Sequence, residues 1–214
     1  MLVEIWSDIV CPWCYIGKRR FERGLEALEP RRDVDVVHRS FQLDPRSPRG
    51  QTSDRRQMLQ RKYGWSTIQA QEMDERMTRT AAAEGLEYRL AGGVTGNTMD
   101  AHQLVQLARH QGVQDAVIER FYRAHFCERR SIFDRDSLVA LAAEAGLDAG
   151  AARDALEQDT YVDAVIRDNA AARAHGVNGV PFFVIDGRYG ISGAQAPEVF
   201  TRTLEQAGAT GPTG

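Results

Sequence analysis

Two cysteines near the beginning of the chain have the spacing of a redox-active pair. Cys11 and Cys14 flank Pro12 and Trp13, and cysteines at positions i and i+3 at the start of a helix can form a disulfide without a change in the backbone. The first of them lies among unpaired N–H groups at the positive end of the helix dipole, where a thiolate is favoured over a thiol. Because a thiolate is the species that attacks a disulfide sulfur, the spacing predicts thiol–disulfide exchange.

Position within the helix gives the residues around this pair different expected roles. Cys11, at the helix start and more exposed, is expected to be the attacking thiolate, and Cys14, one turn further in, is expected to resolve the mixed disulfide. Pro12 and Trp13 bring no positive charge, so we expect them to tune the pair to be less oxidising than one with a histidine at the third position. Asp8 either relays protons to Cys14 or caps the turn into the helix.

Other uses of a cysteine pair fit the sequence less well. A structural zinc site needs four ligands, and the sequence holds no second CxxC and no HxxxH motif. Three cysteines are too few for a secreted domain held together by disulfides. Redox chemistry without a bound metal is therefore favoured. The third cysteine, Cys127, lies at the end of a predicted helix. We interpret it as a free structural thiol, and a redox role stays open.

Composition describes an ordinary globular chain and excludes several classes of partner. The 214 residues are 43% hydrophobic and 27% charged, enough for one large domain or two modest ones. A net charge of −3 gives no electrostatic case for nucleic acid or an anionic membrane. No apolar run approaches the roughly 20 residues of a membrane span, and the N-terminus lacks the basic and apolar regions of a secretory signal. We therefore expect a cytoplasmic protein, with its oligomeric state left open and a monomer compatible with the sequence.

The strand patterns come from the two ends of the chain. Residues 2–7 and 34–41 are predicted strands joined by a helix over 11–28, which makes a βαβ unit with parallel strands. At the other end, residues 182–185 and 188–192 form a hairpin around Asp186-Gly187, followed by a helix over 197–206. Since each end supplies only part of a sheet, we expect the two ends to share one.

Between these ends the sequence predicts helices. Residues 45–50 are a linker rich in proline and glycine, and about six helices follow with little strand signal. Their predicted starts are Thr52 or Ser53, Ser66, Asn97 or Thr98, Asp115, Asp134 and Asp148, the last of these opening a stretch that leads to Gly176.

A proline completes the pattern at the far end of the sheet. Val180-Pro181 directly precedes the apolar strand, where proline is tolerated, and X-Pro bonds are the ones that adopt the cis form at low cost. A CxxC after one strand together with Val-Pro before a hairpin is a more specific signal than CxxC alone.

These motifs resemble those of a known family. Residues 7–18, residues 179–185 with 189–195, and Asn97-Thr98-Met99-Asp100-Ala101-His102 are similar to the FrnE-like branch of the DsbA family. The resemblance implies an α/β, thioredoxin-like fold with a large all-helical domain inserted between its βαβ and ββα halves. It also implies a disulfide oxidoreductase or isomerase. The chain departs from the pattern at Gln103, where a basic residue is expected, and at Cys127.

The resemblance sets expected domains and further residue roles. The thioredoxin-like domain would comprise residues 1–45 and 177–208, the inserted helical domain 46–176, and a disordered tail 209–214. Pro181 is expected to contact the sulfurs and keep metal away, and the backbone of Val180 to pair with an extended substrate segment, although a plain rigid turn stays open. His102 is interpreted as a half-buried, hydrogen-bonded side chain, and Lys18-Arg19-Arg20 as a solvated helix face.

Substrates and cofactors follow from the same interpretation. We expect protein or small-molecule thiols and disulfides as substrates, no cofactor beyond the redox-active disulfide, and glutathione or the thioredoxin system as electron donor. Two alternatives stay open. One is a glutathione-dependent isomerase or transferase of the kappa-like group, whose members place serine at the position of Cys11. The other is a non-catalytic binding or chaperone module.

Overall fold

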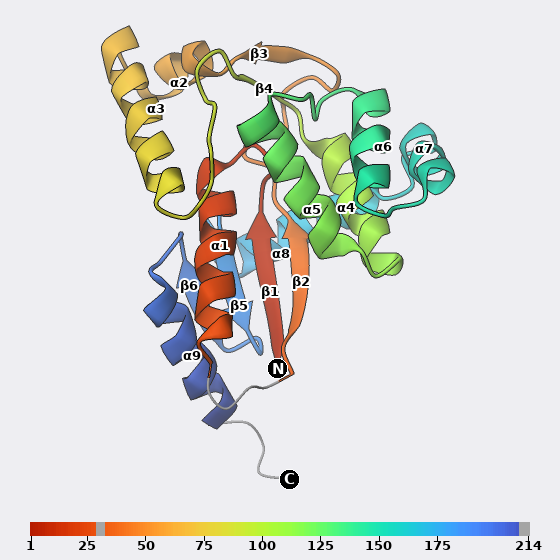
Figure 1. Ribbon diagram of the computed structural model, residues 1–214. Coiled ribbons are helices and arrows are strands. Elements are labelled where there is room, and N and C mark those ends of the chain that lie inside the picture. The colour runs from red at the N-terminus through yellow and green to blue at the C-terminus, as the bar shows by residue number, and fades with distance from the viewer. Residues whose placement is uncertain (29–32, 210–214) are drawn as a thin grey trace.

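Strands from both ends of the chain pair in one four-stranded sheet, as the sequence predicts. In the computed structural model, which describes residues 1–28 and 33–209, the strands follow the order β2 (Asp35–Ser40), β1 (Leu2–Ser7), β5 (Phe182–Ile185) and β6 (Tyr189–Ser192). The two N-terminal strands are parallel, whereas β5 runs antiparallel to both of its neighbours. The sheet therefore joins a βαβ unit to a hairpin from the far end of the sequence (Figure 1).

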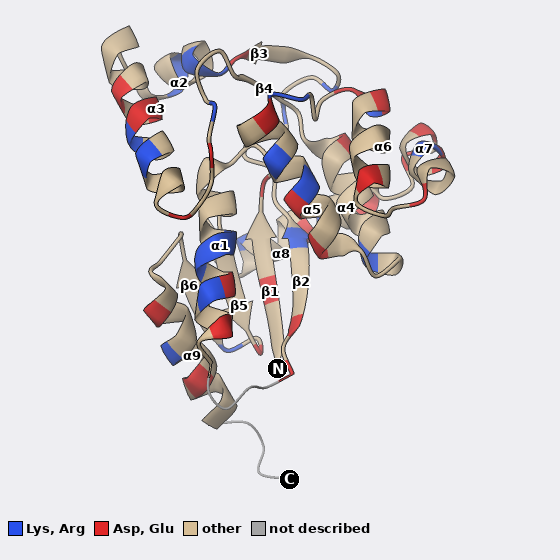
Figure 2. Ribbon diagram, in the orientation of Figure 1, with Lys and Arg blue, Asp and Glu red and all other residues tan. Residues whose placement is uncertain are grey.

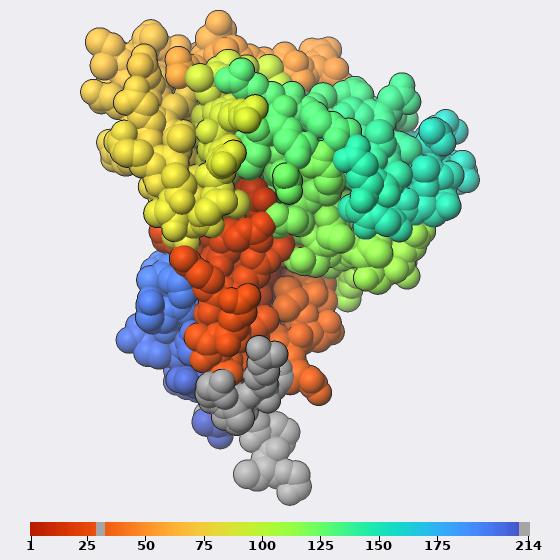
Figure 3. Space-filling view, viewed as in Figure 1, coloured from red at the N-terminus to blue at the C-terminus, as the bar shows by residue number. Residues whose placement is uncertain are grey.

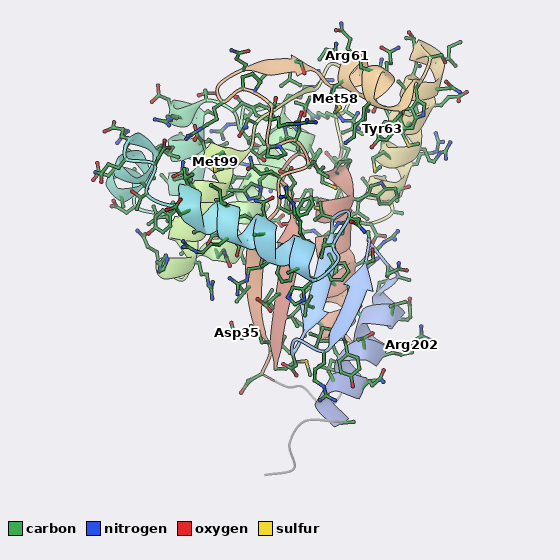
Figure 4. All side chains as sticks on the ribbon, turned by 180° about the vertical axis from the view of Figure 1, so that it is seen from behind. Asp35, Met58, Arg61, Tyr63, Met99 and Arg202 are labelled. Carbon is green, nitrogen blue, oxygen red and sulfur yellow. The ribbon has the colours of Figure 1, made fainter. Side chains whose placement is uncertain are left out.

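Alternate side chains of each strand bury against helices on opposite faces of the sheet. One face is covered by α1 (Pro12–Glu26) and α9 (Pro197–Ala209), and its core contains Val3, Ile5 and Phe183. On the other face Trp6 packs near α8 (Val162–Ala174), which lies across the sheet when the molecule is seen from behind (Figure 4). The sheet is thus covered on both faces, and its strands hold α1 in place.

A large helical segment is inserted between β2 and β5 (Figure 3). It contains, in addition to α8, the helices α2 (Arg55–Tyr63), α3 (Thr67–Ala82), α4 (Met99–His110), α5 (Gln114–Arg123), α6 (Arg135–Glu144) and α7 (Ala149–Glu157), and a π-helical turn η1 (Ala124–Glu128). The thioredoxin-like fold with a helical insertion is confirmed. The domain boundaries at residues 45, 176 and 208 stay predictions.

The insertion is not entirely helical. Thr52–Asp54 forms a short strand, β3, that pairs with β4 (Val94–Gly96). The prediction of a helix start at Thr52 or Ser53 is therefore wrong, since the helix begins after Asp54, whose carboxylate accepts a hydrogen bond of 2.8 Å from the Gln57 N–H. Strands of three residues are too short to show an alternating pattern, so the sequence hides this small sheet.

Other boundaries also differ from the prediction. The stretch after Asp148 divides into α7 and α8, with Asp159 at a left-handed φ of 51° between them. The described residues therefore place seven α-helices in the insertion rather than about six. The last helix continues to Ala209, the first residue of the predicted tail, and residues 210–214 lie outside the described part of the chain.

Ion pairs connect α1 to the insertion. Nζ of Lys18 lies 3.1 Å from Asp115 Oδ1 and 3.2 Å from Glu119 Oε2, and Arg20 Nε lies 2.6 Å from Glu84 Oε1. Basic and acidic positions occur along both α1 and α5 (Figure 2). The interpretation of Lys18-Arg19-Arg20 as a solvated face is wrong, because α5 covers this side of α1 and leaves only 5% of the Lys18 side chain exposed.

Replacing Lys18 tests this connection. Lys18→Met leaves the neighbouring carboxylates without their buried cation, and we expect the free energy of unfolding to fall by about 2–3 kcal/mol. The expected loss is smaller than for a fully buried ion pair, because 67% of the Asp115 side chain is exposed. Urea denaturation at pH 7 measures the change. As a matched control, Arg123→Met removes an exposed partner of Glu128, with an expected change within about 1 kcal/mol. Equal losses in the two variants would contradict a buried role for Lys18.

Candidate active site

The local sequence places Cys11 at the N-terminus of α1. Its φ of −89° and ψ of 110° are those of an extended N-cap residue, and Pro12 occupies the first helical position, where a missing N–H does no harm. The Cys11 N–H donates to the Asp8 carbonyl oxygen at 3.0 Å, and the Cys14 N–H donates to the Cys11 carbonyl oxygen at 3.0 Å. The turn from β1 into α1 (Figure 1) is thereby fixed, with both cysteines at the helix start.

The two thiols differ in burial in the expected order, although neither is freely accessible. Cys11 is 6% exposed and Cys14 is 2% exposed, and both are free thiols. Burial raises the pKa of Cys14 well above its ordinary value, and its hydrogen bond with Cys11 and the charge of that sulfur raise it further. Trp13, by contrast, is 41% exposed beside the pair. Near neutral pH Cys14 therefore holds its proton.

A cis peptide bond from the far end of the chain lies against Cys11. The bond between Val180 and Pro181 is cis, and the Cys11 thiol donates to the Val180 carbonyl oxygen at an Sγ–O distance of 3.5 Å. The ring of Pro181 packs on Gly17 of α1, where an added Cβ would lie 2.8 Å from the proline Cγ. The structure thus brings together the residues that the two distant motifs predict.

Asp8 lies behind the cysteines and does not cap α1 with its side chain. It is 1% exposed, and its Oδ2 accepts a hydrogen bond of 2.7 Å from the Leu43 N–H. Its Oδ1 lies 3.3 Å from Nε2 of His102. The carboxylate charge adds to the rise in the pKa of Cys14, after the larger effects of burial and of Cys11. Of the two roles expected for Asp8, the capping role is wrong.

The insertion supplies contacts to this site that sequence reasoning missed. His102 is 1% exposed rather than half-buried, and its partner is 94 residues away in the sequence. The Tyr88 hydroxyl donates to the Pro12 carbonyl oxygen at 2.7 Å, and its ring stacks on Phe126. No sequence motif marks Tyr88. The Asn97–His102 motif includes His102, but it does not predict Asp8 as the partner of this side chain.

Gln103, where the family pattern predicts a basic residue, has a structural role. Its Nε2 donates to Asp159 Oδ1 at 3.1 Å, and its Oε1 accepts a hydrogen bond of 3.2 Å from the Tyr161 N–H. It therefore connects α4 to the segment between α7 and α8.

Comparisons with known proteins identify the family of the chain. A family model, the DSBA-like thioredoxin domain, matches residues 2–205. The chain belongs to this family. It is similar to a probable DsbA oxidoreductase of Streptomyces coelicolor at 48% identity, with a TM-score of 0.94 over 99% of this chain and 92% of that one. The resemblance to the DsbA family is confirmed, and the chain is grouped with DsbA-like thiol–disulfide oxidoreductases.

Two further relatives extend the comparison. The uncharacterized protein YwbO of Bacillus subtilis strain 168 is 31% identical over 206 residues, which covers 94% of each chain. The cytosolic disulfide reductase DsbM of Pseudomonas aeruginosa shares the fold, with a TM-score of 0.66 at 20% identity over 96% of this chain and 98% of that one.

Two other kinds of feature are absent from the described part of the chain. Across residues 1–28 and 33–209, no group of three or more His, Cys, Asp or Glu side chains has a metal-binding arrangement. None of the helices in those same stretches is long and apolar enough to cross a membrane.

The unequal environments of the cysteines predict unequal alkylation. In the reduced protein at pH 7, iodoacetamide is expected to label Cys11 at least about tenfold faster than Cys14, since each unit of raised pKa lowers the thiolate fraction tenfold. Labelling of Cys14 should speed up as the pH rises. Cys127, half-buried and with its pKa raised by burial, should be slower than Cys11. Peptide mass spectrometry measures the rates, with urea-unfolded protein as the control. Equal rates for Cys11 and Cys14 in the folded protein would contradict the assignment.

The contact between Gly17 and Pro181 predicts a second effect. Gly17→Ala forces Pro181 away from Cys11, and we expect the second-order rate with glutathione disulfide to fall about tenfold or more. Gly24→Ala, on the same helix as Gly17 but away from the thiols, is the matched control. Its Cβ would lie 2.7 Å from the Cβ of Phe200 on α9. Both variants should lose about 1–3 kcal/mol of stability through overpacking, but only the first should react slowly. A normal rate in Gly17→Ala would count against the role of Pro181.

Proposed function

We propose that this protein is a thiol–disulfide oxidoreductase in which Cys11 is the nucleophile and Cys14 the resolving thiol. The observation that carries the proposal is the contact of the Cys11 thiol, at the N-terminus of α1, with the carbonyl oxygen of Val180 at the cis-proline bond. Unpaired N–H groups at a helix N-terminus stabilise a thiolate while it attacks. The buried Cys14 lies one turn away, ready to attack the sulfur of Cys11.

The exchange proceeds in two balanced steps. The Cys11 thiolate attacks a substrate disulfide, a Cys11–substrate disulfide forms, and the first substrate sulfur leaves as a thiolate that takes up a proton. Cys14 then loses its proton and attacks Cys11 Sγ, so that the Cys11–Cys14 disulfide forms and the second substrate thiol leaves. Two electrons pass from the protein to the substrate. The reverse sequence oxidises a dithiol, and attack without net transfer rearranges disulfides, which is isomerase activity.

Neighbouring residues have proposed supporting roles. An extended substrate segment can pair with the backbone of Val180 beside Cys11, while Pro181 holds this segment at the sulfurs. The exposed Trp13 offers apolar surface next to the nucleophile, and Pro12 fixes the helix start. Asp8 is the proposed acceptor for the Cys14 proton, since it is the buried carboxylate whose charge acts on that thiol.

Glutathione or the thioredoxin system is the proposed electron donor, with no further cofactor. Support for glutathione comes from the fold relative DsbM, for which a structure with GSH exists. A reducing, cytoplasmic setting is proposed because the three cysteines of the chain include a redox pair and provide no structural disulfide framework.

Trapping the intermediate tests the proposal. In Cys14→Ser the mixed disulfide on Cys11 cannot be resolved, so a stable adduct with glutathione or a peptide thiol is expected after exposure to the corresponding disulfide. The wild type should catalyse reduction of insulin by dithiothreitol, and Cys11→Ser should lose this activity by at least about a hundredfold. Intact mass measures the adduct, and turbidity measures insulin reduction.

Each remaining outcome points to another function. Absence of both the adduct and the reductase activity would exclude the oxidoreductase. Glutathione-dependent turnover that survives in Cys11→Ser would favour the kappa-like isomerase or transferase. Binding of unfolded polypeptide by the wild type and by Cys11→Ser alike, without reductase activity, would favour the chaperone module.

A further inference from the structure

The carboxylate of Asp8 is buried near the cysteines and the insertion. Among the described residues, it has two hydrogen-bond partners. Asp8 and His102 side chains are each 1% exposed. The hydrogen-bond partners of Asp8 are the Leu43 N–H at 2.7 Å, in the segment after β2, and His102 Nε2 at 3.3 Å, on α4. In the described part of the chain neither lysine nor arginine pairs with Asp8. These two hydrogen bonds are therefore the polar contacts that can act on its carboxylate.

The surroundings of His102 fix which ring nitrogen carries the proton. Nδ1 is buried and has no hydrogen-bond partner among the residues that the structure describes. A proton on Nδ1 would be a buried donor without an acceptor, and no hydrogen bond would offset its loss of hydration. In the neutral imidazole the ring proton therefore lies on Nε2, directed at Asp8.

A carboxylate accepts at both of its oxygens, and each oxygen of Asp8 has a hydrogen-bond partner that can donate to it. A protonated Asp8 would be a donor facing two donors, so one hydrogen bond would be lost. If the donor on Nε2 is removed, one buried oxygen has no partner and the charged form loses its stabilisation.

Other titratable groups around Asp8 supply no cation near neutral pH. They are the thiols of Cys11 and Cys14 on α1, the hydroxyl of Tyr122 on α5 and the ring of His125 in η1. Burial raises the pKa of Tyr122 well above its ordinary value, so its hydroxyl is neutral. Burial, together with the charge of Arg55, lowers the pKa of His125 to about 4, so its ring is neutral as well.

We propose that His102 is a positioning residue that keeps Asp8 ionised, so that the inserted domain controls the resolving step of the exchange. This inference rests on the proposed function. The proton of Cys14 passes to Asp8 while Cys14 attacks Cys11 Sγ. The Cys11–Cys14 bond forms, the Cys11–substrate bond breaks, and the substrate leaves as a thiolate that takes up a proton from solvent.

The packing of α4 keeps the imidazole in place. The His102 N–H donates to the Thr98 carbonyl oxygen at 2.9 Å. One turn further along the helix, Gln106 donates to Ser40 Oγ at 2.9 Å and to Asp168 Oδ2 at 2.6 Å. Met99, labelled in Figure 4, is the first residue of this helix. The donor that serves the active site is therefore anchored to the sheet through β2.

The decisive measurement is the rate of the resolving step between pH 6 and pH 10. When reduced protein is mixed with a large excess of glutathione disulfide, the rate at which the Cys11–Cys14 bond forms reaches a plateau that reports this step. Asp8→Asn is expected to lower the plateau at pH 7 about a hundredfold. In His102→Asn the shorter amide does not reach Asp8, and the plateau is expected to fall at least about tenfold. The deficit of both variants should shrink as the pH rises, because hydroxide increasingly takes the proton of Cys14 in place of Asp8.

Two matched variants separate positioning from a structural role. His102→Gln places an amide N–H near the position of Nε2 and should retain most of the wild-type plateau. Gln103→Leu removes the buried hydrogen bonds of the same helix to Asp159 and to the Tyr161 N–H without touching Asp8 or β2, so it should lose stability and keep the wild-type pH profile. A wild-type plateau in folded His102→Asn overturns the proposal, as does a loss that is the same at every pH or is not rescued by His102→Gln.

A measurement on the wild type needs no variant to fold. Ring ¹⁵N shifts of His102 are expected to show a neutral imidazole protonated on Nε2 at pH 7, and a proton on Nδ1 would overturn the proposal. The oxidoreductase proposal fails separately: in that case the wild type forms no Cys11–Cys14 bond with glutathione disulfide. If Asp8→Asn is slow while His102→Asn is normal, Asp8 remains the acceptor and only the role of His102 is lost.

Discussion

The antiparallel pairing of β1 with β5 is the constraint on which the site depends. Its register opposes Val3 to Ile185 and Trp6 to Phe182, so the end of β1 and the beginning of β5 lie at the same edge of the sheet. Cys11 follows the first strand and Pro181 directly precedes the second. A cis peptide bond therefore meets a helix N-terminus although 169 residues separate Cys11 from Val180. A slip of one residue would exchange the faces of the strand and move the proline away from the sulfurs.

The insertion forms the other wall of the same site, and the packing shows why it cannot be a passive appendage. Its buried side chains share one hydrophobic cluster with Ile9, Cys14 and Tyr15. The ring of Tyr15 stacks at 5.0 Å on Tyr122 of α5. Ion pairs between Lys18 of α1 and two carboxylates of α5 add a second connection. The side of α1 that bears Cys14 is consequently buried against inserted helices, which explains why Cys14 is so poorly accessible.

Sequence alone predicts the parts of this site that depend on local patterns. The spacing of Cys11 and Cys14, the strand before them and the Val180-Pro181 pair are each visible in a few consecutive residues, and the requirement that both ends share a sheet follows from counting strands. Contacts between side chains far apart in the sequence leave no such pattern. Asp8 and His102, or Tyr88 and Pro12, meet only because α4 and the segment after α3 fold over α1. The same limit explains the error at Lys18, whose burial depends on a helix that begins about a hundred residues later.

The arrangement divides the two chemical steps between two parts of the fold. In the proposed mechanism Cys11 attacks substrate from the start of α1, beside the cis-proline bond. Cys14, the proposed resolving thiol, shares a hydrophobic cluster with the insertion, burial raises its pKa, and His102 of the insertion lies beside Asp8. A slow second step lengthens the life of the mixed disulfide and favours exchange with another thiol, whereas a fast one commits the protein to two-electron transfer. Changes in the inserted helices can therefore shift the balance between isomerisation and net reduction while the CxxC motif stays the same.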